Sequence, residues 1–179
     1  GSTTGTLRVM GMADGSGDSG NNHGDCYIGD AIKHSSGLAL PANSGDTILG
    51  VAVAFGKAAT GLMGHAPSFD PGDLTRNHFQ HADTNTEWYV WYYPAEGNIF
   101  EIQSSTDLDS VMGAELDFTV DANESHGSRV TGLSNAELLG DTNSDVVVVQ
   151  VPDEGYHLTG YVDNDYTLAN TRYWVCLLY

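Results

Sequence analysis

The chain consists of short apolar runs separated by glycine, asparagine, aspartate and serine. This pattern is typical of an all-β domain with many turns, and helices are expected to be scarce. We therefore predict a single-domain antiparallel β-barrel or β-sandwich with long glycine-rich loops and little helix. The predicted strands are residues 6–12, 26–34, 47–56, 87–93, 98–103, 114–120, 145–151, 156–162 and 171–179.

The most aromatic segment is residues 88–103, WYVWYYPAEGNIFEIQ. The sequence PAEGN divides two apolar runs and carries Pro94 and Gly97, so it predicts a β-hairpin between residues 87–93 and 98–103. Trp88 and Trp91 fall on opposite sides of the first strand because side chains alternate along it. Two interpretations remain open: both faces belong to the core, or one face is core and the other a contact surface.

Three runs are apolar on both faces, namely residues 48–55, 146–151 and 173–179. Strands of this kind need cover on both sides, from a second sheet, from loops of a closed barrel or from another subunit. The last run lies at the end of the sequence, and an unpaired apolar edge there would promote aggregation, so we expect it to be paired or covered.

The segments between strands predict loops and an arm. Residues 13–25 are rich in glycine, serine and asparagine, so we assign residues 1–24 to a flexible N-terminal arm and residues 25–179 to the β-domain. Residues 57–86 form a long segment without strand periodicity, and we expect this segment and the arm to reach neighbouring subunits.

The third long segment contains a predicted helical turn. Within residues 121–144, the sequence SNAELLG offers Ser134 as a helix N-cap and Gly140 as a stop. The sequence shows no internal repeat.

Charge limits the classes of partner. Lys and Arg number 6 against 24 Asp and Glu, which gives a formal net charge of −18. Such a field repels phosphate backbones and anionic lipid, so neither nucleic acid nor membrane is an expected partner. No stretch approaches the roughly 20 apolar residues that a bilayer-spanning helix needs. Cys26 and Cys176 match neither a zinc ribbon nor a CxxC pair and are predicted to be buried free thiols, with a disulfide as the alternative.

Residues with metal-binding chemistry are present but poorly spaced. His78, His81 and Asp83 would face one metal only on a helix, so we interpret them as solvated loop side chains. The loop with Asp14, Ser16, Asp18 and Asp25 lacks the glycine and the terminal glutamate of a calcium loop, and residues 141–146 also lack the glycine. We predict no metal and no cofactor.

No catalytic constellation is identified either. Neither a GxSxG elbow nor a phosphate or dinucleotide loop occurs, and no base lies beside either cysteine in the sequence. A carboxylate pair for glycoside hydrolysis stays open, because 24 acids allow many spatial pairs. We predict a protein without enzymatic activity.

The order of several strands resembles a known class of protein. Gly29-Asp30 begins a strand, Gly50 to Val53 reads GVAV, and a later strand after a proline turn ends in FEIQ, Phe100 to Gln103. In order and character, residues 25–151 are similar to the decoration (cement) proteins of tailed-bacteriophage heads. The resemblance implies a virion structural protein on the outer capsid surface, which binds the major capsid protein and itself forms a homotrimer. A negative charge and apolar surface hidden only on docking are compatible with that role.

A carbohydrate-binding β-domain of a tail or secreted protein is the alternative function. In this interpretation Trp88, Trp91, Tyr92 and Tyr93 form an aromatic platform on which sugar rings stack. It predicts exposed rings, whereas capsid decoration predicts rings buried in a trimer or against the shell.

Overall fold

The computed structural model contains twelve strands in the residues that it describes, and no helix among them. The all-β prediction is therefore confirmed. The described residues are 6–12, 25–57, 78–79, 88–104, 113–119, 127, 133–139, 145–150 and 172–178. The strands are β1 (Arg8–Gly11), β2 (Cys26–Tyr27), β3 (Ala31–Ser35), β4 (Leu38–Pro41), β5 (Ile48–Lys57), β6 (His78–Phe79), β7 (Trp88–Pro94), β8 (Phe100–Gln103), β9 (Glu115–Thr119), β10 (Glu137–Leu139), β11 (Val146–Gln150) and β12 (Arg172–Leu177).

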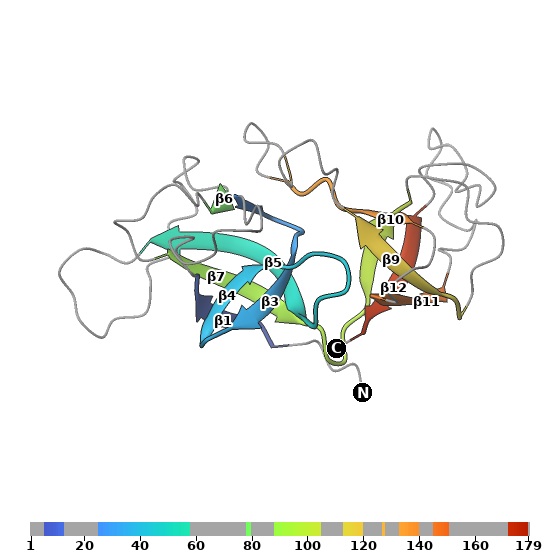
Figure 1. Ribbon diagram of the computed structural model, residues 1–179, viewed down its shortest axis with the longest axis horizontal. Coiled ribbons are helices and arrows are strands. Elements are labelled where there is room, and N and C mark those ends of the chain that lie inside the picture. The colour runs from blue at the N-terminus through green and yellow to red at the C-terminus, as the bar shows by residue number, and fades with distance from the viewer. Residues whose placement is uncertain are drawn as a thin grey trace.

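Two five-stranded antiparallel sheets lie side by side (Figure 1). The first sheet has the order β1-β7-β5-β3-β4 and the second sheet the order β10-β9-β11-β12-β8, while β2 and β6 form a small separate pair. In each sheet the two edge strands meet at one parallel bridge, Met12 with Ala39 in the first and Ser104 with Leu138 in the second. Each sheet therefore curls on itself, which hides its edges.

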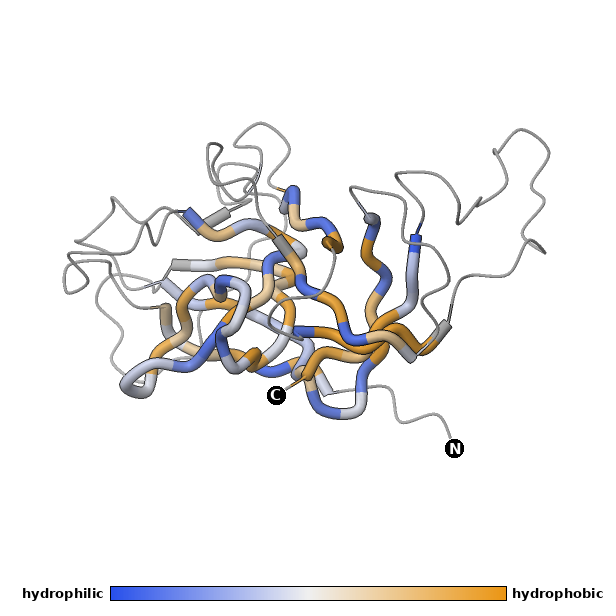
Figure 2. Tube along the Cα trace, turned by 45° about the vertical axis from the view of Figure 1, so that its right-hand side comes forward, coloured by the Kyte–Doolittle hydropathy of each residue, from blue (hydrophilic) through white to orange (hydrophobic). Residues whose placement is uncertain are grey.

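The apolar residues form two cores, and Figure 2 shows how hydrophobic segments gather along the strands. One core lies on the inner face of the first sheet and includes Cys26 of β2: Met12, Cys26, Ile32, Ala39, Ala52, Phe55, Trp88, Val90 and Tyr92. The second core combines the inner face of the second sheet with residues of the first: Ala31, Ala42, Ile48, Ala95, Leu116, Phe118, Leu138, Val146, Val148, Tyr173, Val175 and Leu177. The first sheet thus covers the second.

This arrangement explains the runs that are apolar on both faces. Ile48 packs in the second core, whereas Phe55 of the same strand packs in the first core. The cover of β5 comes from the second sheet of the same chain, so its apolar pattern requires no partner molecule. The last run, β12, lies between β11 and β8 and is paired on both sides.

The predicted hairpin across PAEGN is wrong. β7 pairs with β1 and β5 in the first sheet, whereas β8 pairs with β12 in the second. The turn at Gly97, which has a φ of 75°, therefore links two sheets. The two runs separate because each pairs with an apolar strand elsewhere: β7 pairs with Gly50–Lys57 of β5, and β8 completes the second sheet beside β12.

Two other local predictions also need correction. The predicted strand 26–34 is broken by a turn, in which the Asp30 amide donates to the Tyr27 carbonyl at 3.1 Å and Gly29 has a φ of 98°. The predicted helical turn at 134–140 is instead the strand β10. The Ser134 hydroxyl does accept a hydrogen bond from the Ala136 amide at 3.0 Å, but it shapes the approach to a strand.

The predicted N-terminal arm contains a strand of the first sheet. Residues Arg8–Gly11 form β1, so a deletion of residues 1–24 would remove an edge strand as well as any arm. Residues 1–5 and 13–24 lie outside the described residues, as do nearly all of 57–86 and the predicted strand 156–162. Their predicted roles stay predictions.

Candidate functional site

Strand β7 has one face in the core and one face outside it. Trp88, Val90 and Tyr92 are buried in the first core, at 2%, 0% and 3% exposure. Between them, Trp91 is half-buried and Tyr93 is 41% exposed on the opposite face. This alternation follows from the pleat of the strand, and it favours the interpretation of one core face and one contact face.

Strand β1 extends the outward face of β7. Val9 lies directly opposite Trp91 and is 48% exposed, and Leu7, just before β1, is 45% exposed. Half-buried Tyr89 lies opposite Gly11, which has no side chain of its own. We call this surface the apolar outer face; its residues are Leu7, Val9, Tyr89, Trp91 and Tyr93.

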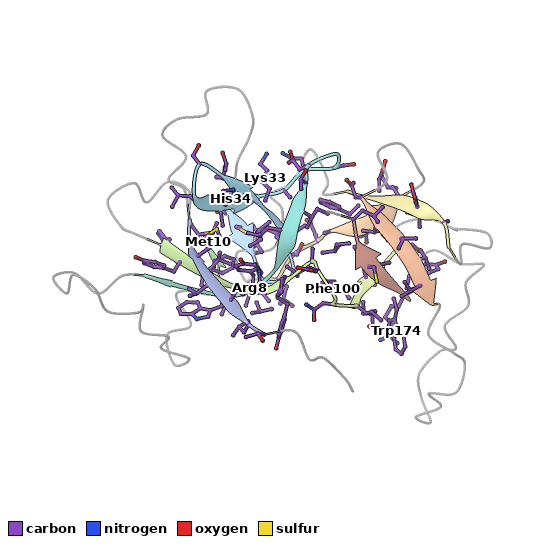
Figure 3. The ribbon with its side chains drawn as sticks, turned by 90° about the horizontal axis from the view of Figure 1, so that it is seen from below. Arg8, Met10, Lys33, His34, Phe100 and Trp174 are labelled. Carbon is purple, nitrogen blue, oxygen red and sulfur yellow. The ribbon has the colours of Figure 1, made fainter. Side chains whose placement is uncertain are left out.

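The second sheet presents a different surface at its β8–β12 edge. Glu101 lies opposite Trp174, accepts a hydrogen bond from its indole Nε1 at 3.3 Å and pairs with Arg172 at 3.2 Å. Figure 3 shows the Trp174 side chain projecting from the outer surface of this sheet. The Glu101 and Arg172 side chains are about half exposed. This edge is therefore polar, in contrast to the apolar outer face.

The predicted sugar platform does not form as proposed. Trp88 and Tyr92 lie in the core and cannot meet a ligand, so only Trp91 and Tyr93 of the four remain on the outer face. The alternation of side chains along a strand already places Trp88 and Tyr92 on one face and Trp91 and Tyr93 on the other.

A cavity of about 410 Å³ lies between the inner face of the second sheet and the first sheet. Most of its lining is apolar, including Phe100, which Figure 3 shows between the two sheets, and Val51. The carboxylate in the lining belongs to Glu101, which is already paired with Arg172. The described lining therefore lacks the pair of carboxylates that glycoside hydrolysis needs.

Cys26 and Asp30 are buried near the turn that begins β3. Both cysteines are free thiols, as predicted, although Cys176 is half-buried. Burial raises the pKa of the Cys26 thiol, and the neighbouring Asp30 carboxyl raises it further. A thiol that stays protonated is a poor nucleophile. Burial also raises the pKa of Asp30 to about 7, and hydrogen bonds from Ser134 and from the Tyr27 amide lower it only in part.

The buried acids have structural partners. Asp30 Oδ2 accepts a hydrogen bond from the Tyr27 amide at 2.7 Å, which fixes the turn around Gly29. Asp145 Oδ1 accepts one from the Gly45 amide at 2.7 Å, so it ties the second sheet to a loop of the first. These carboxyl groups hold backbone amides, which is a role in folding.

Comparison with known protein families, characterised proteins and solved structures finds no match. The function must therefore be argued from the residues and their arrangement.

The residues that were considered and rejected as metal ligands in the sequence are only partly described by the structure. His78 pairs with Tyr27 in the small β2–β6 sheet, while His81 and Asp83 lie outside the described residues, as do Asp14, Ser16 and Asp18. Within the part of the chain that is described, no group of three or more His, Cys, Asp or Glu side chains is placed to hold a metal ion. Among the same residues, no helix is long and apolar enough to span a membrane.

Proposed function

We propose that this protein is a virion structural protein that decorates and stabilises the outer surface of an icosahedral phage capsid. The observation that carries the proposal is the apolar outer face on β1 and β7. Its most exposed members, Leu7, Val9 and Tyr93, are between 41% and 48% exposed. Contiguous apolar surface of this kind on a strongly acidic chain indicates contact with another protein.

The remaining support comes from charge and from the sequence. A net charge of −18 opposes contact with DNA and limits nonspecific association between particles. The resemblance of residues 25–151 to cement proteins implies that the partner is the major capsid protein. It also implies that the protein docks as a homotrimer. When many copies bind one shell, their individually weak contacts would together give a large stabilisation through avidity.

Contact through the apolar outer face predicts a large effect of one substitution. Val9→Glu places a carboxylate opposite Trp91 at the centre of this face. In solution the change is tolerated because Val9 is half exposed, but docking would bury the new charge without a partner. We expect occupancy on undecorated phage heads to fall at least tenfold, or by about 1.4 kcal/mol or more in binding free energy.

Co-sedimentation of the protein with undecorated heads measures this occupancy. Val149→Glu is the matched control, because Val149 of the second sheet is 36% exposed and gains the same charge. Binding by the control but not by Val9→Glu, with equal melting temperatures, supports the proposal. If both variants bind as the wild type does, the apolar outer face is not the docking surface. Failure of the wild type to bind any head, together with a shift of tryptophan emission on adding glycans, would favour the carbohydrate-binding alternative.

A further inference from the structure

We infer that the chain contains an internal repeat: each sheet is one copy of the same five-stranded unit. Numbered by their order within the unit, the strands of the first sheet are β1, β3, β4, β5 and β7, and those of the second are β8 to β12. Both sheets then have the spatial order third, second, fourth, fifth, first. This order is not the simple sequential one, so its recurrence is informative.

The closure of the two sheets matches residue for residue. In each, the residue that follows the first strand bridges in parallel to the second residue of the third strand: Met12 to Ala39, and Ser104 to Leu138. The bridge that joins the first and third strands therefore lies at equivalent positions in the two sheets.

The register of the central strands matches as well. β5 and β7 pair at Ala52 with Tyr92 and next at Ala54 with Trp91, which leaves one bulged residue. β11 and β12 pair at Val148 with Val175 and next at Gln150 with Trp174, which leaves one bulged residue at the equivalent place. Bulges interrupt a ladder at specific positions, so a shared bulge supports the equivalence.

A third shared feature lies just before the second strand of each unit. Gly29 has a φ of 98°, and its amide donates to the Ala52 carbonyl at 2.8 Å. Gly113 has a φ of 79°, and its amide donates to the Val148 carbonyl at 2.9 Å. Ala52 and Val148 are the residues that precede the two bulges. Glycine is required at both positions because other residues rarely adopt a positive φ.

The repeat makes the two outer faces directly comparable. The registers of the first and last strands place Val9 at the position of Glu101, Tyr89 at that of Arg172, and Trp91 at that of Trp174. The tryptophan is shared, but its neighbours are apolar in the first copy and an ion pair in the second. Resting on the proposed function, this difference confines docking to the first copy.

The double variant Val9→Glu, Tyr89→Arg tests the repeat in the full chain. It transplants the Glu101–Arg172 pair to the equivalent positions around Trp91. In the wild type, the Trp174 indole donates to Glu101, so Glu101→Gln should shift the NMR resonance of this indole. In the double variant we expect the Trp91 indole resonance to shift in the sense opposite to that of Trp174 in Glu101→Gln, because Trp91 gains a carboxylate acceptor, while the Trp174 resonance is unchanged.

A second measurement keeps the test independent of side-chain orientation. Scalar couplings across hydrogen bonds should be found both for Gly29 with Ala52 and for Gly113 with Val148. Both couplings together with the expected shift of the Trp91 indole resonance support the repeat. The absence of either coupling, or a Trp91 indole that does not respond in a variant with both couplings, overturns it. Neither readout involves capsids, so a failure of head binding would contradict the proposed function alone.

Discussion

Gly50→Ala is expected to destabilise the protein severely. A Cβ atom at Gly50 would overlap the carbonyl oxygen of Tyr93 and approach Tyr92 Cδ2 to 2.8 Å and Pro94 Cα to 3.0 Å. Two of these atoms are backbone, on a strand that β5 pairs along its length. The clash cannot be relieved by a rotamer change, so we expect a loss of about 4 kcal/mol or more, beyond the usual range for one substitution.

Urea unfolding followed by tryptophan fluorescence measures this loss. Gly11→Ala, in the same sheet, is the matched control, because its Cβ would approach the end of the Leu38 side chain to 3.2 Å, and the nearest backbone atom, the Trp88 carbonyl oxygen, would lie at an ordinary contact distance of 4.0 Å. That side chain is 40% exposed and free to move. The control should stay within about 1 kcal/mol of the wild type. A Gly50→Ala protein that unfolds as cooperatively as this control, at a similar midpoint, would show that the close approach of β5 and β7 is wrong.

Asp30→Asn is expected to stabilise the protein at neutral and alkaline pH. Burial raises the pKa of Asp30 from 3.8 to about 7, so between these values the folded state keeps a proton that the unfolded state loses. The stability contributed by this proton is fully present below about pH 4 and is lost as pH rises through 7. Complete loss corresponds to at most about 4 kcal/mol, at 1.36 kcal/mol for each pKa unit.

The difference between variant and wild type isolates this effect from the other acids. Asparagine keeps an oxygen for the Tyr27 amide and carries no charge. The unfolding free energy of Asp30→Asn should therefore change less with pH between pH 4 and 7 than that of the wild type. Glu96→Gln removes a charge at an exposed position and serves as the control. A constant difference between Asp30→Asn and wild type from pH 4 to pH 8 would mean that Asp30 titrates as an ordinary carboxyl.

Sequence pattern predicted the strands better than their partners. Runs such as 47–56 and 87–93 alternate or are continuously apolar, and they are strands because burial depends on that local pattern. Partner choice depends on contacts between distant residues. The short segment PAEGN looks like a hairpin turn, yet Pro94 ends a strand of the first sheet and Phe100 begins one of the second.

The repeat was missed for a related reason. Matched pairs share few residues, among them Gly29 with Gly113, Val51 with Val147 and Trp91 with Trp174. The loops between strands also differ in length, so no fixed spacing marks the repeat in the sequence. Only the strand order and register show it.

The candidate site was predicted in part. Alternation placed Trp88 and Trp91 on opposite faces of one strand, as observed. Which face would be exposed depended on the neighbouring strand β1, which places Val9 opposite Trp91 and Gly11 opposite Tyr89. β1 and β7 are the first and last strands of the first sheet in the sequence, so their pairing leaves no signal in either segment alone.

The most direct test of the proposed function is electron cryomicroscopy of undecorated phage heads incubated with this protein. We predict additional density on the outside of the shell, with β1 and β7 of each bound copy facing the capsid and Val9 and Trp91 in contact with it. Heads without additional density, or bound copies whose β1–β7 face points to solvent, would contradict the account.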